Sequence, residues 1–155
     1  MQGNPIPRPV LWLGLLGLLP FFGSAALIGA GSPWIAQIGA ASFAIYGAVI
    51  LSFLGGVRWG LEIAREPSAP VAARLVFSVL ASLVGWALAL WIVLGGGALI
   101  ATGTAAAFAA QFIWDRAAGA EGLAPRWYPR LRLILTSGVL AACLAIPILS
   151  LLDVR

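Results

Sequence analysis

Five polar side chains in an otherwise apolar chain have types and spacings that could do chemistry. Arg58 and Glu62 stand four residues apart, Gln111 and Asp115 repeat that spacing, and Arg132 follows a short polar connection. Residues four apart lie on one face of a helix. An ionised group inside a membrane span costs about 2.5–3.5 kcal/mol at the helix centre and normally has a partner. We therefore predict an intramembrane polar cluster of these five residues, in which Glu62 or Asp115 pairs with Arg58.

Two interpretations of this cluster stay open at the level of sequence. In the first, its residues form a polar site within the membrane. In the second, they lie at the level of the lipid headgroups, where they anchor the helices and bind lipid phosphate.

Catalysis is the chemistry that the composition supports least. The chain has no His and no Lys, so within the spans only Glu62 and Asp115 could act as the base that activates a hydroxyl nucleophile. Cys143 is the single cysteine, which excludes an intramolecular disulfide, and without His the ordinary zinc, haem and non-haem iron sites cannot form. We expect no catalytic activity, no metal and no cofactor.

The elements that must position these residues are membrane-spanning helices. Of the 155 residues, 62% are hydrophobic and 9% are charged, whereas a soluble domain has roughly 25% charged residues. Five apolar stretches are long enough to cross a hydrocarbon core of about 30 Å. They cover residues 10–30, 36–64, 71–94, 98–115 and 131–152. The sequence thus predicts an all-α polytopic membrane protein, in which residues 1–155 form a single five-helix transmembrane bundle.

The arginines predict how the chain is threaded. Five spans place the N-terminus and the second and fourth connections on one side of the membrane, and Arg58 lies close to that side. The other arginines on that side are Arg8, Arg65, Arg74, Arg116, Arg126, Arg130 and Arg132. Only Arg155 falls on the opposite side. Because Arg-rich loops stay in the cytoplasm, we predict an N-in/C-out topology. Trp86 falls near neither interface, and we expect it to pack in the core.

A stripe of small residues marks the second predicted helix as the centre of the bundle. Every fourth residue from 36 to 64 is small, and the stripe includes Ala44, Ala48, Ser52, Gly56 and Gly60. Small residues at this spacing let helix backbones approach closely in lipid. We expect these five residues to pack against neighbouring helices.

Arginines interleaved with aromatic residues precede the last span. Arg126, Trp127, Tyr128 and Arg130 could hold an anionic lipid at about 1 kcal/mol per basic residue. Plain positive-inside bias is the alternative explanation. No module that reads nucleic acid accompanies these residues, so we expect no nucleic-acid partner.

Four segments together resemble a known family. They are GLLGLLPFFG at 14–23, YGAVILSFLGGVRWGLE at 46–62, FIWDR at 112–116 and PRWYPRLRLILT at 125–136. The chain resembles, over nearly its whole length, the bacterial and mitochondrial membrane family of unknown function that includes transmembrane protein 69. The resemblance implies a small multi-pass protein of the bacterial inner membrane or, in a eukaryote, of the mitochondrial inner membrane. It implies no catalytic or binding role for any residue.

Two functional hypotheses follow. The first is a non-catalytic accessory or assembly factor that acts through helix packing, with a larger membrane complex or a second copy of itself as partner. The second is a carrier or receptor for a small lipophilic or anionic ligand, bound near Arg58 and Asp115 between the second, fourth and fifth helices. A pocket at that place would favour the second hypothesis.

Overall fold

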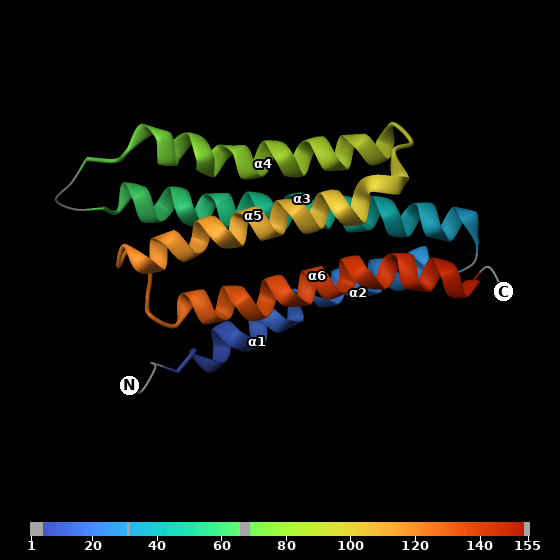
Figure 1. Cartoon of the computed structure of the whole chain (residues 1–155), viewed down its shortest axis with the longest axis horizontal. Helices are drawn as coiled ribbons and strands as arrows, with labels where there is room; N and C mark the ends of the chain where they lie inside the picture. The colour runs from blue at the N-terminus through green and yellow to red at the C-terminus, as the bar shows by residue number, and fades with distance from the viewer. Residues whose placement is uncertain (1–4, 31, 66–68, 154–155) are drawn as a thin grey trace.

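The computed structural model of the chain describes residues 5–30, 32–65 and 69–153. Every regular element in those ranges is a helix, which confirms the predicted all-α class (Figure 1). The elements are α1 (Arg8–Leu16), α2 (Leu19–Ile28), α3 (Pro33–Ile63), α4 (Ala72–Val93), the 3-10 helix η1 (Gly97–Leu99), α5 (Ile100–Ala120) and α6 (Tyr128–Asp153).

The helices are long and apolar enough for a membrane bundle. Among the described residues, four candidate spans meet both conditions: Arg8–Ile28, which includes both α1 and α2, then α3, α4 and the segment Tyr128–Leu149 of α6. α5 has 21 residues and packs among them, although Gln111 and Asp115 make it less apolar. The start of α1 lies at the same end of the bundle as the last turns of α3 and α5 and the first turns of α4 and α6 (Figure 1), and we call this the arginine-rich end. Which side of the membrane it faces stays a prediction.

The first predicted span consists of two helices. α1 ends at Leu16, and Pro20 lies in the first turn of α2. Proline has no backbone N–H and clashes with the carbonyl group four residues earlier, so the helical ladder is interrupted here. Tyr46 Oη donates a hydrogen bond of 2.8 Å to the Gly17 carbonyl oxygen. This contact from α3 satisfies one of the backbone acceptors that the break leaves free.

α5 continues beyond its predicted end at residue 115, as far as Ala120. The charge of Asp115 suggests a helix end only if the carboxylate must reach water. In the structure the Asp115 side chain is buried and paired, as described below, so the helix has no need to stop there.

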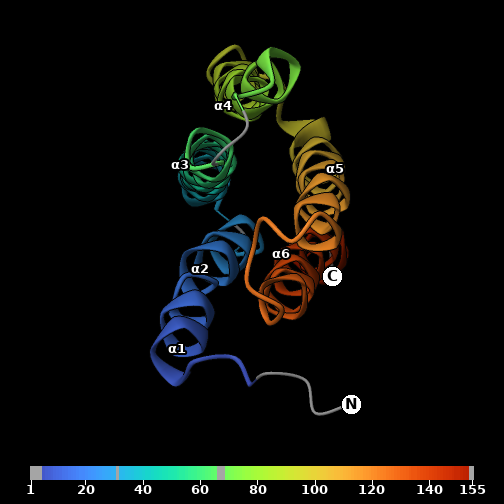
Figure 2. The ribbon, with the colours of Figure 1, turned by 90° about the vertical axis from the view of Figure 1, so that its left-hand side faces the viewer.

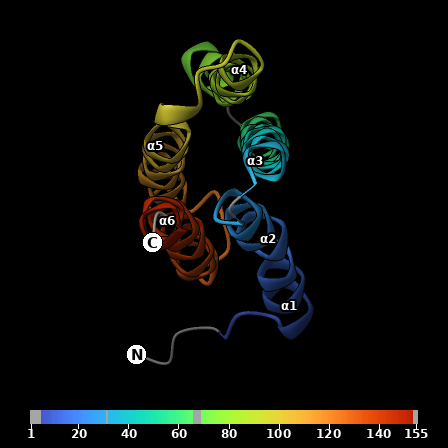
Figure 3. The same cartoon turned by 90° about the vertical axis from the view of Figure 1, so that its right-hand side faces the viewer.

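The helices form two rows that an aromatic cluster joins. α4, α3, α2 and α1 follow one another in one row, and α5 and α6 lie beside them (Figures 2 and 3). Phe21 of α2 makes edge contacts with Phe43 and Tyr46 of α3, with ring centroids 5.2 and 5.0 Å apart. Phe21 also contacts Phe108 of α5 at 5.6 Å. One buried ring therefore holds α3 and α5 in place around the polar residues that they carry.

Only part of the predicted small-residue stripe packs inside the bundle. Ala44 is buried, and Ala48 lies against the backbone of α4. Ser52 and Gly56 are exposed, and a Cβ added to Gly56 or Gly60 would meet no described atom within 4 Å. The expectation that Ser52, Gly56 and Gly60 pack against helices of this bundle is therefore wrong.

Helical geometry explains this outcome. A step of four residues advances about 40° beyond a full turn, so the stripe rotates about 160° between Ala44 and Gly60. It therefore passes from the core to the outer surface of α3. The close approach to α4 occurs at Gly55, where an added Cβ would overlap the carbonyl oxygen of Ser78.

Trp86 lies on the outer surface of the bundle, because it is not on the face of α4 that packs against the other helices. The buried residues of α4 are Ser78, Ala81, Gly85 and Ile92. Trp86 follows Gly85 by one residue, which is about 100° around the helix, and it is 63% exposed. The expectation that Trp86 packs in the core is wrong.

Candidate functional site

Asp115 is the centre of a buried group of polar side chains. Its side chain has no exposed surface. Arg132 of α6 donates from Nε to Asp115 Oδ2 at 2.7 Å. Gln111, one turn earlier on α5, donates from Nε2 to Asp115 Oδ1 at 3.1 Å. Both carboxylate oxygens are thus satisfied, one of them by a charged donor, which makes a short and strong bond.

Arg58 approaches this group from α3, and within the described ranges it has no ion-pair partner. The residue is 5% exposed, and its guanidinium carbon lies 4.3 Å from the centre of the Trp114 ring. The charge of Asp115 acts on Arg58, but among the described residues Arg58 forms no ion pair with Asp115 or Glu62. The expected pairing is therefore absent, and a cation–π contact stands in its place. Such a contact is worth about 0.5–2 kcal/mol, less than a buried ion costs.

The buried group carries an excess of positive charge. Two guanidinium groups, of Arg58 and Arg132, face the single carboxylate of Asp115, which leaves a net charge of +1. Five buried polar atoms have no hydrogen-bond partner among the described residues: Arg58 Nε, Arg58 Nη1, Tyr128 Oη, Arg132 Nη2 and Thr136 Oγ1. Each of them can donate a hydrogen bond. The arrangement is suited to a negatively charged acceptor.

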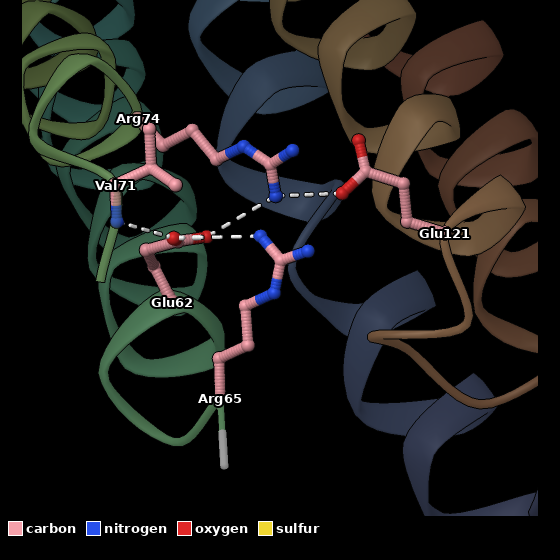
Figure 4. A network of polar contacts seen from close by, with 5 residues as sticks. All are labelled: Glu62, Arg65, Val71, Arg74 and Glu121. Carbon is pink, nitrogen blue, oxygen red and sulfur yellow. Dashed lines mark hydrogen bonds and ion pairs between the residues drawn. The ribbon is translucent and has the colours of Figure 1, made fainter. Parts of the chain in front are cut away.

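Glu62 belongs to a different network, which connects the ends of three helices (Figure 4). Its Oε1 accepts the Val71 backbone N–H at 2.7 Å and lies 3.7 Å from Arg65 Nη1. Its Oε2 lies 3.4 Å from Arg74 Nη1. The same Arg74 atom lies 2.6 Å from Glu121 Oε2 at the end of α5. Because Val71 is the residue before the first turn of α4, Glu62 caps α4 while Arg74 ties it to α5.

The predicted lipid-contact segment lies partly inside the protein. Arg126 and Arg130 are exposed. The rings of Trp127 and Tyr128 contact each other with centroids 6.4 Å apart, but the Tyr128 hydroxyl is buried, and the charges of Asp115, Arg132 and Arg58 act on it. Lipid binding by Arg126 and Arg130 stays a prediction.

Sequence reasoning missed three residues that take part in these networks. Thr136 follows Arg132 by four residues and therefore shares its helix face, a signal that was present in the sequence. Trp114 and Glu121 gave no such signal, since their partners Arg58 and Arg74 lie on other helices.

A cavity of about 350 Å³ lies beside the buried group. Its walls come mainly from α1, α3 and α6, with Phe21 and Phe108 at its inner side. Arg132 and Thr136 contribute to the wall, and the other lining residues are apolar. Small-molecule sites have this character, with mostly apolar walls and a few placed polar groups. Arg58 and Asp115 are not among the lining residues, so this cavity is not the pocket predicted beside these two residues between α3, α5 and α6.

Comparison with known proteins agrees with the membrane assignment. A family model described as a protein of unknown function (DUF3429) matches residues 6–149. Transmembrane protein 69 of Xenopus tropicalis is 42% identical over 81 residues, which are 52% of this chain and 32% of that protein. Transmembrane protein 69 of Mus musculus is 35% identical over 82 residues, 52% of this chain and 33% of that protein. The match thus covers about a third of the length of each relative. No solved structure matches the chain.

Proposed function

This chain belongs to the DUF3429 family of membrane proteins of unknown function, and on that premise we propose that it is a non-catalytic receptor or carrier for a small lipophilic or anionic ligand. The ligand binds at the arginine-rich end, beside Arg58 and Asp115. The membrane that houses it is the bacterial inner membrane or its mitochondrial counterpart.

The observation that carries this proposal is the unpaired charge of Arg58. An ionised side chain inside a membrane protein is costly and generally functional. The packing around Arg58 supplies one aromatic face, and Nε and Nη1 have no acceptor in the part of the chain that the structure describes. A protein selected for stability alone would gain from a neutral side chain here. A bound anion explains why the guanidinium is present.

Replacing the charge tests the proposal. We expect Arg58→Met to leave the thermal midpoint of the ligand-free protein, in a neutral detergent, equal to or higher than that of the wild type. We expect the same variant to lose the stabilisation that a lipophilic anion such as oleate gives to the wild type. The measurement is the thermal midpoint, followed by tryptophan fluorescence, with oleate and with the uncharged oleyl alcohol.

Arg116→Met is the matched control, because Arg116 is an exposed arginine next to Asp115 on the same end of α5. It removes the same charge and should keep the response to oleate. An equal response of the wild type to oleate and to oleyl alcohol contradicts the proposal.

A second candidate function is the packing of a partner's transmembrane helix against α3. Ser52, Gly56 and Gly60 lie on the outer surface of α3, where the two glycines have open space around them. Small residues at this spacing promote close helix association in lipid. Since the bundle itself does not use these positions, they are available to a helix of a larger membrane complex, for which this chain would be an accessory or assembly factor.

Bulky side chains on this face should abolish such an association. We expect the double variant Gly56→Leu and Gly60→Leu to run as a free protein after gentle detergent extraction, whereas the wild type runs as a larger complex in native mass spectrometry. The exposed Ala87→Leu on α4 is the control and should keep the complex. A wild type that is monomeric after extraction from its native membrane contradicts this function, and a complex of twice the chain mass identifies a second copy as the partner.

A further inference from the structure

The cavity beside Arg132 is elongated along the helix axes. On α6 its wall runs from Leu131 to Val139, a distance of about 12 Å at 1.5 Å per residue. On the opposite side its wall runs along α1 from Val10 and continues to Phe21 of α2. A channel of this shape and of about 350 Å³ suits a narrow apolar chain.

The channel is open toward the membrane. No residue of α1 is buried, so this wall is only loosely attached to the bundle. Two residues of the lining are among the most exposed apolar side chains in the described structure, Leu13 with 70% and Phe53 with 65% exposure. In a bilayer these residues face acyl chains, so a lipid chain can enter from the side.

The polar residues of the wall lie one turn apart on α6. Arg132 is 4% exposed and Thr136 is 3% exposed. Arg132 donates from Nε to Asp115. Within residues 5–30, 32–65 and 69–153, neither Arg132 Nη2 nor Thr136 Oγ1 has a hydrogen-bond partner. Two donors of one helix face can converge on a single acceptor. Because both atoms are nearly covered, their side chains must shift slightly when an acceptor binds, as side chains at binding surfaces commonly do.

Charge decides which acceptor fits. A neutral acceptor such as an ester carbonyl would satisfy the donors but leave the net charge of +1 in the group of Arg58, Asp115 and Arg132. An oxyanion satisfies both the donors and the charge. Arg132 lies about 6 Å along α6 from Tyr128, which is a depth that a headgroup near the membrane interface can reach.

We propose that the channel between α1, α3 and α6 binds one acyl chain whose oxyanion headgroup, a carboxylate or a phosphate, is held by Arg132 and Thr136. This inference rests on the proposed receptor function and adds the ligand class and the place of its two ends. Arg132 and Thr136 hold the head, and the apolar lining from Val10 to Val139 holds the chain.

Thr136→Val tests the proposal, because valine keeps the shape of threonine and removes only the hydroxyl. The ligand-free variant should be as stable as the wild type, since the Thr136 hydroxyl makes no hydrogen bond to any described residue. Loss of a hydrogen bond to a charged group corresponds to about a tenfold or greater loss of affinity. We therefore expect Thr136→Val to bind palmitate at least about tenfold more weakly, and Thr136→Ser to bind it normally. Ser137→Val, at the exposed neighbouring position, is the control and should bind like the wild type.

The choice of probes distinguishes binding of the charged headgroup from binding of the acyl chain, and a carboxylate headgroup from a phosphate headgroup. Binding to the full chain in neutral nanodiscs is measured by native mass spectrometry with palmitate, methyl palmitate, acetate and dioleoyl phosphatidic acid. We expect binding of palmitate or phosphatidic acid and none of methyl palmitate or acetate; the stronger of the two binders shows whether a carboxylate or a phosphate is preferred. Equal binding of palmitate and its methyl ester, or wild-type affinity in Thr136→Val, overturns the inference.

The outcome also separates this inference from the proposed function. If palmitate binds and depends on Arg58 but not on Thr136, a receptor site exists at Arg58 and the assignment to the channel is wrong. If no lipophilic anion binds to the wild type, both proposals fall.

Discussion

Asp115→Asn is expected to lower the free energy of unfolding by about 3–5 kcal/mol, the cost of removing one partner from a buried ion pair. The amide keeps the volume of the carboxylate and one acceptor but has no charge. Arg132, at 4% exposure, then loses the anion that its Nε contacts at 2.7 Å. Arg58 also loses the negative charge of Asp115, which acts on it more strongly than that of Glu121, so the repulsion between two buried cations is less well compensated. The loss is measured by unfolding the purified protein in mixed micelles with increasing denaturing detergent.

Glu121→Gln is the control for this substitution. It also converts an acid of the α5 end into an amide and breaks a shorter ion pair, 2.6 Å from Glu121 Oε2 to Arg74 Nη1. The two side chains are 35% and 27% exposed, so water and salt screen the pair. Pairs of this kind contribute up to about 1 kcal/mol. Equal losses for Asp115→Asn and Glu121→Gln would show that burial does not distinguish these carboxylates.

The double variant Asp115→Leu and Arg132→Met should regain most of the stability. Replacing both members of a buried pair by apolar side chains of similar size is often neutral or stabilising. The double variant is made in the Arg58→Met background, because Arg58 would otherwise be left as an unpaired buried charge. If the double variant is as unstable as Asp115→Asn, the pair is needed for packing rather than for charge balance. A restored fold without anion binding would show that the charges serve the ligand.

The polar group illustrates how far sequence reasoning reaches in this chain. Gln111 and Asp115 are neighbours because they are four residues apart on one helix, and local spacing is sufficient to predict that contact. Glu62 is four residues from Arg58 by the same rule, yet it binds the Val71 N–H and Arg74. The start of α4 offers Glu62 a backbone donor and a cation, and this approach of another helix is not encoded in the spacing along α3. Helix existence and type followed from composition, whereas the choice among partners depended on tertiary packing.

The adjacent residues Gly55 and Gly56 show that spacing in the sequence is also insufficient to predict which small residues pack against another helix. The four-residue spacing from Ala44 predicts that Gly56 packs against a neighbouring helix, and it makes no such prediction for Gly55. In the structure a Cβ on Gly55 would overlap the Ser78 carbonyl oxygen of α4, while a Cβ on Gly56 would meet nothing within 4 Å. The axis of contact between α3 and α4 follows the real helical period of 3.6 residues rather than a period of four.

Opposite effects are therefore expected for the same one-carbon change at adjacent positions. Gly55→Ala forces two backbones apart along the most extensive helix contact of the bundle, and overpacking of this kind costs about 1–3 kcal/mol. Gly56→Ala adds a methyl group to open space and replaces the poorest non-proline helix former by the best, a gain of up to about 1 kcal/mol. The two variants are compared by unfolding in mixed micelles, with hydrogen exchange at α4 as a local readout that should increase only in Gly55→Ala. If Gly56→Ala proves the more damaging of the two, α4 packs on the other face of α3, and Arg58 then no longer lies against Trp114 in the interior.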